Sequence, residues 1–404
     1  MKLYKHQEKL IELNPKKWLL SWSCGTGKTL AIIKLCDNNN LKTLIICPKS
    51  VKEQWSKELE KWSEKSELYF ILTKEEFKKR HKEIDIFDCV CIDEIHFFSN
   101  FKSQLTKSLL WYVYKYDIKH IYGATATPYL SSVWNIYTYG LIYGRCSKES
   151  WYKWSIRYFD RIKMGRRTIP VQKKTVDGIP IGNIIKKNIN LLGNTVDIND
   201  CFDVPEQTFL EEYFYLTKDQ SNAIDNLLDV EPIARWTKIH QICGGFVNNK
   251  YSEDNKFKCE KFERAVELAK EHKKIAIVCR YHNEIDNLKE KIVKFKQVFE
   301  ISGRVKQIKE SQEAEECVIL IQAATSEGYE LPDVPIMIFY SYDFSIKNFI
   351  QISGRILRAN HLKKNVYISL VVKGTIDNDI HKSMKIKQDF HIELYAKKRT
   401  ENNS

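Results

Sequence analysis

The chain has 404 residues, of which 43% are hydrophobic and 29% charged, and its formal net charge is +13. This length exceeds the size at which one core keeps growing, so two domains are expected. No apolar run approaches the roughly 20 residues that span a bilayer, and the first residues lack the apolar segment of a signal peptide. The eleven cysteines have no paired spacing, which is typical of free thiols in the reducing interior of a cell, cytoplasm or nucleus. The positive charge favours a polyanionic partner, above all nucleic acid.

Strand-like and helix-like patterns alternate in two blocks. The first block has predicted strands at 18–21, 43–47, 68–72, 89–92 and 120–123. Its clearest helical pattern covers 51–62, where one face carries Val51, Trp55, Leu59 and Trp62. The second block has predicted strands at 275–279, 298–301, 318–322, 336–340 and 366–371. Alternation of this kind predicts parallel, doubly wound sheets, and two such blocks predict two lobes.

A glycine-rich loop follows the first predicted strand and precedes a helical pattern. It reads Trp22-Ser23-Cys24-Gly25-Thr26-Gly27-Lys28-Thr29. A strand–loop–helix unit with this ending presents backbone N–H groups and a helix N-terminus to phosphates. Lys28 would neutralise the β and γ oxygens of a triphosphate, and the Thr29 hydroxyl would ligate Mg²⁺. Trp22 stands where the usual G-x-x-x-x-G-K-T pattern has its first glycine.

An acidic pair, Asp93-Glu94, follows the predicted strand at 89–92. Behind a phosphate loop, Asp93 would hold Mg²⁺, usually through water, and Glu94 would orient and deprotonate the attacking water. Phosphoryl transfer requires such positioning and charge compensation more than covalent chemistry. On its own, the pair would be equally consistent with solvated carboxylates at the end of a strand.

Between the two blocks the chain becomes aromatic and basic. An apolar stripe, expected to be helix core, consists of Trp151, Trp154, Tyr158 and Ile162. A separate basic stripe at i, i+4 and i+8 consists of Lys153, Arg157 and Arg161. The basic stripe is as consistent with contacts to nucleic-acid phosphates as with the solvated face of a helix.

Near the end of the chain, Gln351, Arg355 and Arg358 are spaced at i, i+4 and i+7. On a helix, all three would project from one face. Such a face could reach the γ-phosphate and supply an arginine finger. A purely solvated basic helix is less consistent with Gly354, which lowers helix stability without a packing gain.

Together these motifs resemble the superfamily-two nucleic-acid-dependent ATPases, above all the SWI/SNF-type double-stranded DNA translocases. The resemblance runs nearly end to end and includes, besides the segments above, His6-Gln7, Gln54-Trp55, Asp93-Glu94-Ile95-His96, Gly123 to Pro128, Gly303 and Gly374-Thr375-Ile376-Asp377. His6-Gln7 resembles the adenine-reading glutamine motif of the family. The family pattern "aGG.GlNL" is kept here chiefly at Gly328 and Leu331, and Ala359-Asn360-His361 replaces "iGQ".

The resemblance implies an α/β protein with two tandem RecA-like parallel-sheet lobes and a helical insertion between them. The expected boundaries are 1–140 for the first lobe, 141–200 for the basic and aromatic insertion with its linker, and 201–404 for the second lobe. It also implies an ATP-dependent motor on duplex DNA, with Mg²⁺ held by Thr29 and Asp93. The residues expected to hold ATP are His6, Gln7, Gly25, Thr26, Gly27, Lys28, Thr29 and Gly328. The expected catalytic residues are Lys28, Asp93, Glu94, Gln351, Arg355 and Arg358.

Two other functions remain open at this point. One is a helicase that separates the strands of RNA or forked DNA, because sequence motifs separate translocases from helicases only by resemblance. The other is a nucleic-acid-binding module with a regulatory nucleotide site. The presence of Lys28, Asp93, Glu94, Arg355 and Arg358 favours a working motor.

Overall fold

The computed structural model describes two compact units, Met1–Asp203 and Val204–Ser404. The described residues are 3–126, 133–145, 151–164, 167–201, 207–227, 230–248, 255–325, 329–357, 364–386, 390, 392 and 395. Only the backbone is described for residues 133, 134, 162–164, 167–169 and 255. No helix of the described segments is long and apolar enough to cross a membrane.

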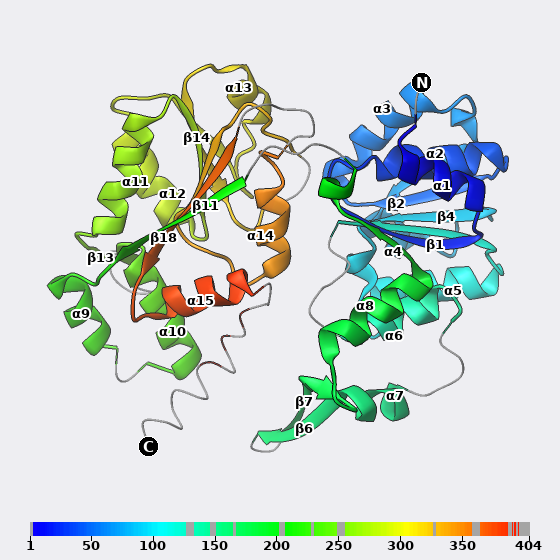
Figure 1. Ribbon diagram of the computed structural model, residues 1–404, viewed down its shortest axis with the longest axis horizontal. Helices are drawn as coiled ribbons and strands as arrows, with labels where there is room; N and C mark the ends of the chain where they lie inside the picture. Colours follow the sequence, from blue (N-terminus) through cyan, green and yellow to red (C-terminus); the bar gives the residue numbers. More distant parts are fainter. Residues whose placement is uncertain are drawn as a thin grey trace. The chain divides into compact units, whose positions relative to one another are not determined.

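The first unit is built on a six-stranded parallel sheet in the order β10-β1-β5-β4-β2-β3 (Figure 1). Its strands are β1 (Lys17–Trp22), β2 (Thr43–Cys47), β3 (Tyr69–Thr73), β4 (Cys89–Asp93), β5 (His120–Thr125) and β10 (Gly193–Val196). The sheet is covered on both faces, which is why its central strands are almost continuously apolar.

Helices bury one apolar core on each face of this sheet. One core receives Leu10, Ile32 and Trp55 from α1 (Lys5–Leu13), α2 (Lys28–Asn38) and α3 (Lys52–Trp62). The other receives side chains from α4 (Lys74–Arg80), α5 (Gln104–Lys115), α6 (Val133–Ile142) and α8 (Ile181–Leu192). The predicted helix at 51–62 is therefore confirmed, with Trp55 and Leu59 buried at its centre.

Five strands of the first sheet lie where the sequence predicts them, but β10 was not predicted. It is only four residues long, Gly-Asn-Thr-Val, and its polar residues give no strand pattern. It pairs in parallel with β1, with Leu19 opposite Gly193. The first unit consequently extends to Asp203 and includes residues 141–200, which the sequence assigned to a separate insertion and linker.

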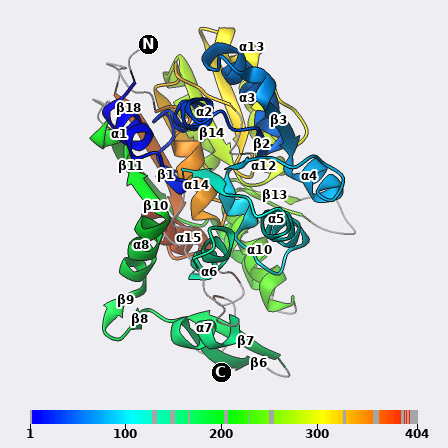
Figure 2. The ribbon, with the colours of Figure 1, turned by 90° about the vertical axis from the view of Figure 1, so that its right-hand side faces the viewer.

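Within the insertion, one helix and two small hairpins precede α8 (Ile181–Leu192). Helix α7 (Trp151–Tyr158) is followed by β6 (Phe159–Met164) and β7 (Arg167–Gln172), which pair antiparallel. A second pair, β8 (Thr175–Val176) and β9 (Ile179–Pro180), precedes α8. The β6–β7 hairpin projects beyond α8, away from the sheet (Figures 1 and 2).

This arrangement corrects the prediction of a single basic helical face. Lys153 and Arg157 lie on α7, whereas Arg161 lies on β6 because the helix ends at Tyr158. Trp151 and Trp154 do pack inward, as expected, against Tyr137 of α6. The i, i+4, i+8 pattern therefore extends past the true end of the helix, where Phe159 instead begins a strand.

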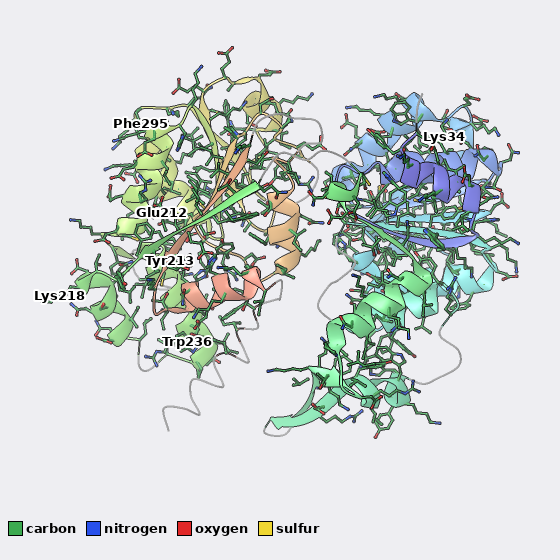
Figure 3. All side chains as sticks on the ribbon, viewed as in Figure 1. Lys34, Glu212, Tyr213, Lys218, Trp236 and Phe295 are labelled. Carbon is green, nitrogen blue, oxygen red and sulfur yellow. The ribbon has the colours of Figure 1, made fainter. Side chains whose placement is uncertain are left out.

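The second unit contains a six-stranded parallel sheet in the order β11-β18-β17-β14-β16-β15. Its strands are β11 (Gln207–Phe214), β14 (Lys274–Cys279), β15 (Val298–Ile301), β16 (Cys317–Gln322), β17 (Ile336–Phe339) and β18 (Asn365–Val372). The five strands predicted in this block are all present. The edge strand β11, which carries Glu212 and Tyr213 (Figure 3), was missed because its burial does not alternate regularly.

Helices also cover both faces of the second sheet. One face is covered by α11 (Glu260–Glu271) and α12 (His282–Ile292). The other is covered by α9 (Lys218–Asp225), α10 (Pro232–Cys243), α13 (Ile308–Glu313), α14 (Ile346–Ser353) and α15 (Ile376–Lys385). A short antiparallel pair, β12 (Phe246–Val247) and β13 (Asn255–Lys256), follows α10.

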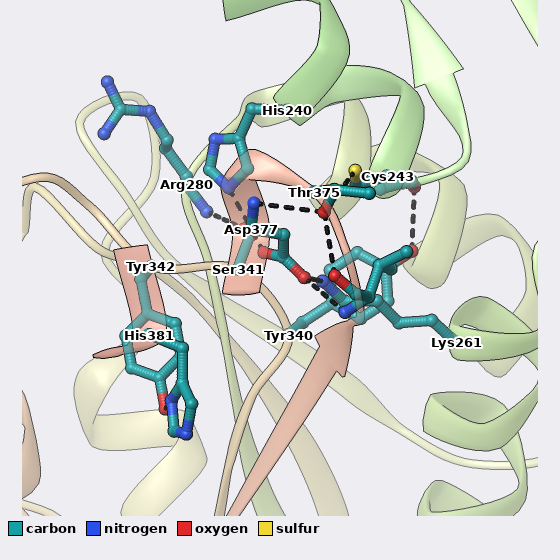
Figure 4. Close-up of polar contacts among 12 residues, drawn as sticks. His240, Cys243, Lys261, Arg280, Tyr340, Ser341, Tyr342, Thr375, Asp377 and His381 are labelled. Carbon is teal, nitrogen blue, oxygen red and sulfur yellow. Dashed lines mark hydrogen bonds and ion pairs between the residues drawn. The ribbon is translucent and has the colours of Figure 1, made fainter. Parts of the chain in front are cut away.

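A buried ion pair joins α11 to α15 in the second unit (Figure 4). Lys261 Nζ lies 2.9 Å from Asp377 Oδ2, and each residue is 1% exposed. The Val372 N–H donates to the same oxygen at 2.9 Å, and the His240 ring lies 3.4 Å from the other. Burial raises the pKa of Asp377, but Lys261, His240 and Val372 outweigh this effect and hold it well below its ordinary value. Removing either charge would leave the other buried and uncompensated.

The close approach of β10 to β1 gives a first prediction. A Cβ atom at Gly193 would collide with the backbone of Leu19. We expect Gly193→Ala to force β10 away from β1 and to lower the free energy of unfolding by about 1–3 kcal/mol, as overpacking does. Urea unfolding followed by tryptophan fluorescence measures the effect.

Gly182→Ala is the matched control, because a Cβ at Gly182 in α8 meets no atom within 4 Å. That substitution should be neutral or slightly stabilising, since alanine favours helices over glycine. Equal unfolding midpoints for the two variants would show that the close approach of β10 does not matter for stability.

Candidate nucleotide-binding site

The predicted phosphate loop connects β1 to α2, as the strand–loop–helix pattern requires. Gly25 and Gly27 both have φ of 77°, a left-handed conformation that favours glycine. The Thr26 hydroxyl donates to the Ser23 carbonyl at 2.7 Å and closes the loop. Helix α2 begins at Lys28, so its first N–H groups lie at the loop and favour an anion there.

Lys28 folds back over the loop that it follows. Its Nζ donates to the carbonyls of Trp22 at 2.9 Å and Ser23 at 3.1 Å. These carbonyls hold the ammonium group beside the space that the loop encloses. The group is thus positioned to exchange backbone acceptors for phosphate oxygens.

Trp22, which replaces the first glycine of the usual loop pattern, is held in place by contacts with β10. Trp22 is wholly buried, and its indole Nε1 donates to Asn194 Oδ1 at 2.9 Å. The Trp18 indole donates to the same oxygen at 2.9 Å. The Ser23 N–H also donates to the Val196 carbonyl at 2.9 Å, which extends the pairing of the two strands into the loop. Asn194 is therefore a supporting residue, and no motif or spacing in the sequence indicates it.

The start of α1 packs against the outer side of the loop. His6 Nε2 lies 2.8 Å from the Thr26 carbonyl, and Gln7 Nε2 donates to the Gly27 carbonyl at 3.0 Å. On its other side, the His6 ring contacts Cys201, with Sγ 3.2 Å from Nδ1. The resemblance placed His6 and Gln7 at the nucleotide, and the structure places them directly on its phosphate loop.

Asp93 ends β4 and lies close enough to Lys28 for the ammonium charge to act on it. Burial, and then the Glu94 carboxylate, raise the pKa of Asp93 to about 6. The Trp55 indole opposes this rise by donating to Asp93 Oδ2 at 2.8 Å, and the Lys28 ammonium opposes it as well. The Thr29 hydroxyl and the Asp93 carboxylate are hard oxygen donors, the type that Mg²⁺ prefers, so the residues present fit this ion.

Glu94 adopts a left-handed backbone conformation with φ of 51°, which is uncommon outside glycine. Its Oε2 lies 2.9 Å from His96 Nδ1 and accepts a hydrogen bond from Thr125 Oγ1 at 3.2 Å. Both partners come from the ends of neighbouring strands, because His96 follows β4 and Thr125 ends β5. The carboxylate is thus held in one orientation at the carboxyl edge of the sheet, where α/β proteins bind ligands.

The predicted catalytic residues of the second unit do not form one helical face. Gln351 is buried on α14, which ends at Ser353, so Arg355 lies in the turn that follows. Gly354 follows the last residue of this helix, and the low helix propensity of glycine favours termination there. The Arg355 guanidinium donates to the Tyr329 carbonyl at 2.9 Å. Arg358 and Gly328 lie outside the described residues.

The predicted basic residues are all exposed at the insertion. Lys153 and Arg157 lie on α7, and the Arg161 guanidinium lies 4.5 Å from the centre of the Tyr152 ring. The Tyr152 ring is itself 57% exposed. A cation stacked on an exposed aromatic ring is a combination that can bind a nucleic-acid backbone and its bases.

Two family models match separate segments of the chain. The SNF2-related domain matches residues 12–85, and the helicase conserved C-terminal domain matches residues 258–360. The first segment contains the phosphate loop, and the second contains four strands of the second sheet together with Arg355. These two segments are thus similar to an SNF2-related domain and to a helicase C-terminal domain, which confirms the resemblance inferred from the motifs.

Among solved structures, the chain is similar to the Sulfolobus solfataricus SWI2/SNF2 ATPase core in complex with double-stranded DNA. The two sequences are 18% identical, and the TM-score is 0.40. The match covers 96% of this chain and 91% of that one. No curated protein matches the chain.

The hydrogen bond from Trp55 to Asp93 gives a second prediction. If the protein hydrolyses nucleotide with Mg²⁺ held by Asp93, this carboxyl must be ionised, so hydrolysis should rise with pH as it deprotonates near pH 6. The indole stabilises the charged form and lowers the pKa, so Trp55→Phe should move the midpoint of the kcat/KM profile upward by about one pH unit. The titration of the nucleotide itself is common to both proteins and cancels in the comparison.

Trp55 is also a core residue, so the variant should lose some thermal stability as well. A loss of folded protein lowers the whole profile without moving its midpoint. Superimposable normalised profiles would therefore show that the indole does not tune Asp93.

Proposed function

We propose that the protein is a Mg²⁺-dependent ATP hydrolase that couples hydrolysis to movement along duplex DNA. The observation that carries this proposal is the arrangement of Lys28, Asp93 and Glu94 at one edge of the first sheet. A phosphate-binding lysine next to a metal-binding carboxylate and an oriented second carboxylate is the set that phosphoryl transfer to water requires.

Each residue of this set has a distinct role in the proposed reaction. The loop N–H groups and Lys28 bind the phosphates, and Thr29 and Asp93 hold Mg²⁺, which neutralises charge on the phosphate oxygens. Glu94 accepts the proton of the attacking water, because Thr125 and His96 orient its carboxylate. We further propose that Arg355 and Arg358 of the second unit stabilise the charge that develops in the transition state.

Duplex DNA is the proposed partner because of charge and family resemblance. Residues 151–174 contain eight basic residues and one acidic residue, Asp160, so this segment alone contributes +7 to the net charge. Contacts to phosphates supply most of the affinity of proteins that bind DNA without sequence preference. The resemblance to SWI/SNF-type motors favours movement along the duplex without strand separation.

A strand-separating helicase is the second candidate, and one structural observation favours it. The β6–β7 hairpin projects from the first unit beside the basic residues of α7 (Figure 2). A projecting two-stranded element of this kind could enter a fork between two strands. An unwinding assay on forked DNA, run beside a triplex-displacement assay on intact duplex, distinguishes the two activities.

A third prediction tests the ATPase. Lys28→Ala should weaken ATP binding and abolish turnover, because the cation that meets the phosphates is lost. Glu94→Gln should leave ATP binding nearly unchanged and lower kcat by at least a hundredfold, because only the transfer of the water proton is impaired. Steady-state phosphate release and equilibrium binding of ATP measure the two effects. Turnover in Glu94→Gln within a few-fold of the unmodified protein would contradict the role of this residue.

A fourth prediction tests the basic residues of the insertion. Joint replacement of Lys153, Arg157 and Arg161 by glutamine should weaken duplex DNA binding equally for all sequences. Each lost phosphate contact reduces the slope of log K against log salt by about 0.9, so three contacts would reduce it by up to ~2.7. Fluorescence anisotropy at several salt concentrations measures this slope.

The matched control replaces three other exposed basic residues of the first unit by glutamine, Lys78, Lys79 and Arg80 at the end of α4. It changes the net charge by the same amount and should leave the slope nearly unchanged. If both variants change the slope equally, the insertion has no special contact with DNA. Stimulation of the ATPase by single-stranded RNA alone would favour the helicase alternative.

A further inference from the structure

Tyr139 of α6 has a buried hydroxyl that makes no hydrogen bond within the described part of the chain. The side chain is 0% exposed. Burying a hydroxyl without a partner destabilises a protein, because the group has lost its hydrogen bonds to water. Such groups are rare in native structures, so this hydroxyl requires an explanation.

Tyr143, one helical turn further along, is a buried tyrosine whose hydroxyl does have a partner. Its N–H donates to the Tyr139 carbonyl at 2.9 Å, so the helical turn continues to this residue. Its hydroxyl donates to the Trp18 carbonyl of β1 at 3.2 Å. The two tyrosines therefore differ in one respect that matters here, which is the state of the hydroxyl.

Helix α6 runs from the carboxyl edge of the first sheet back along its strands. Near the middle of the helix, the Thr138 hydroxyl donates to the Ser99 carbonyl at 2.6 Å, beyond the end of β4. Past the end of the helix, the Tyr143 hydroxyl lies against Gly123 in β5, where a Cβ atom would collide with it. Tyr139 is consequently nearer to the carboxyl edge than Tyr143 is.

The spacing along the helix places Tyr139 at the level of Glu94. One helical turn advances about 5.4 Å, which is nearly two residues of a strand at about 3.3 Å each. Two residues beyond Gly123 is Thr125, whose hydroxyl donates to Glu94 Oε2 at 3.2 Å. Burial, and then the Glu94 charge, raise the pKa of Tyr139 well above its ordinary value, so the phenol stays protonated and acts only as a donor.

The contacts of Glu94 described above both use one oxygen of its carboxylate. His96 Nδ1 lies 2.9 Å from Oε2, and Thr125 donates to the same atom. In structures without substrate, the hydrogen bonds of a catalytic group are often incomplete and form fully only in the complex. A buried donor at the level of Glu94, with no partner of its own, is suited to complete them.

We infer that Tyr139 is a positioning residue for Glu94, and that its hydroxyl donates to this carboxylate when nucleotide is bound. The hydroxyl transfers no proton and holds the carboxylate toward the attacking water. The inference rests on the proposed function, because it takes Glu94 as the group that accepts the proton of that water. It explains why a destabilising hydroxyl is kept in the core.

The test uses Tyr139→Phe, which removes the hydroxyl and nothing else. With saturating duplex DNA and Mg²⁺, kcat for ATP hydrolysis should fall about tenfold or more, because a hydrogen bond to a carboxylate is lost in the transition state. Equilibrium binding of ATP should not change. The melting temperature should stay the same or rise, because the variant no longer buries an unsatisfied hydroxyl.

Tyr143→Phe is the matched control, because it removes a hydroxyl that already has a partner. Its melting temperature should fall, and its kcat per folded protein should stay unchanged. Opposite effects of the two substitutions on stability and on turnover are not expected if both tyrosines only fill the core.

A second comparison shows whether Tyr139 acts through Glu94. In a Glu94→Gln background, measured under single-turnover conditions, Tyr139→Phe should not lower the rate further, because the carboxylate that the hydroxyl positions is absent. Independent, multiplicative losses from the two substitutions would overturn the inference.

An unchanged kcat in Tyr139→Phe would also overturn the inference, as would a loss confined to ATP binding. A drop in melting temperature as large as that of Tyr143→Phe, or a failure to fold, would show that the hydroxyl already has a partner such as a buried water, and would overturn it too. Absence of hydrolysis by the unmodified protein would instead contradict the proposed function, so the two failures are distinguishable.

Discussion

The backbone carbonyls of the phosphate loop are the groups on which the candidate site depends. A loop that turns its N–H groups inward must turn its carbonyls outward, and each outward carbonyl needs a donor. Here the donors are Lys28 for the start of the loop, and His6, Gln7 and the Ala31 N–H for its end. The start of α1 and the segment after β10 lie against this loop because its outer surface requires partners.

The two carboxylates of the acidic pair, Asp93 and Glu94, are likewise held by hydrogen bonds or close polar contacts to neighbouring residues. Asp93 is held by the Trp55 indole and by the Glu94 N–H, and Glu94 is held by His96 and Thr125. The left-handed conformation of Glu94 costs backbone energy, and such strain is commonly kept at functional sites. The two side chains thus have defined orientations, and in the proposed reaction this would lower the reorganisation that is needed.

The central strands and the phosphate loop could be predicted because their signals are local. A run of apolar residues such as Thr43–Cys47 indicates a buried strand by itself, and Gly25 to Thr29 indicates a phosphate loop by composition and spacing. The partners of the loop could not be predicted in the same way. Asn194 and Cys201 are distant in sequence from the loop and carry no pattern, so only the folded sheet brings them to Trp22 and His6.

The predicted helical faces are wrong where the spacing of their residues continues past the end of the helix. The spacing of Lys153 and Arg157 continues to Arg161, although Phe159 begins a strand, and the spacing of Gln351 continues to Arg355, although the helix ends at Ser353. Periodic spacing indicates that a helix is present but not where it ends, because the ends of helices and strands depend on tertiary packing.

The position of β10 has a consequence for the synthesis of the protein. Strand β5 ends at Thr125, but β10 begins only at Gly193, after the whole basic and aromatic insertion. A ribosome therefore releases β1 to β5 well before the strand that completes their sheet, and the edge of β1 stays open to other chains during that interval. The nascent first unit also lacks the Asn194 and Cys201 contacts until residue 201 has emerged. Its candidate nucleotide site is consequently completed only as the chain begins the second unit, and translational pausing within the insertion would prolong the stage in which the edge of β1 is exposed.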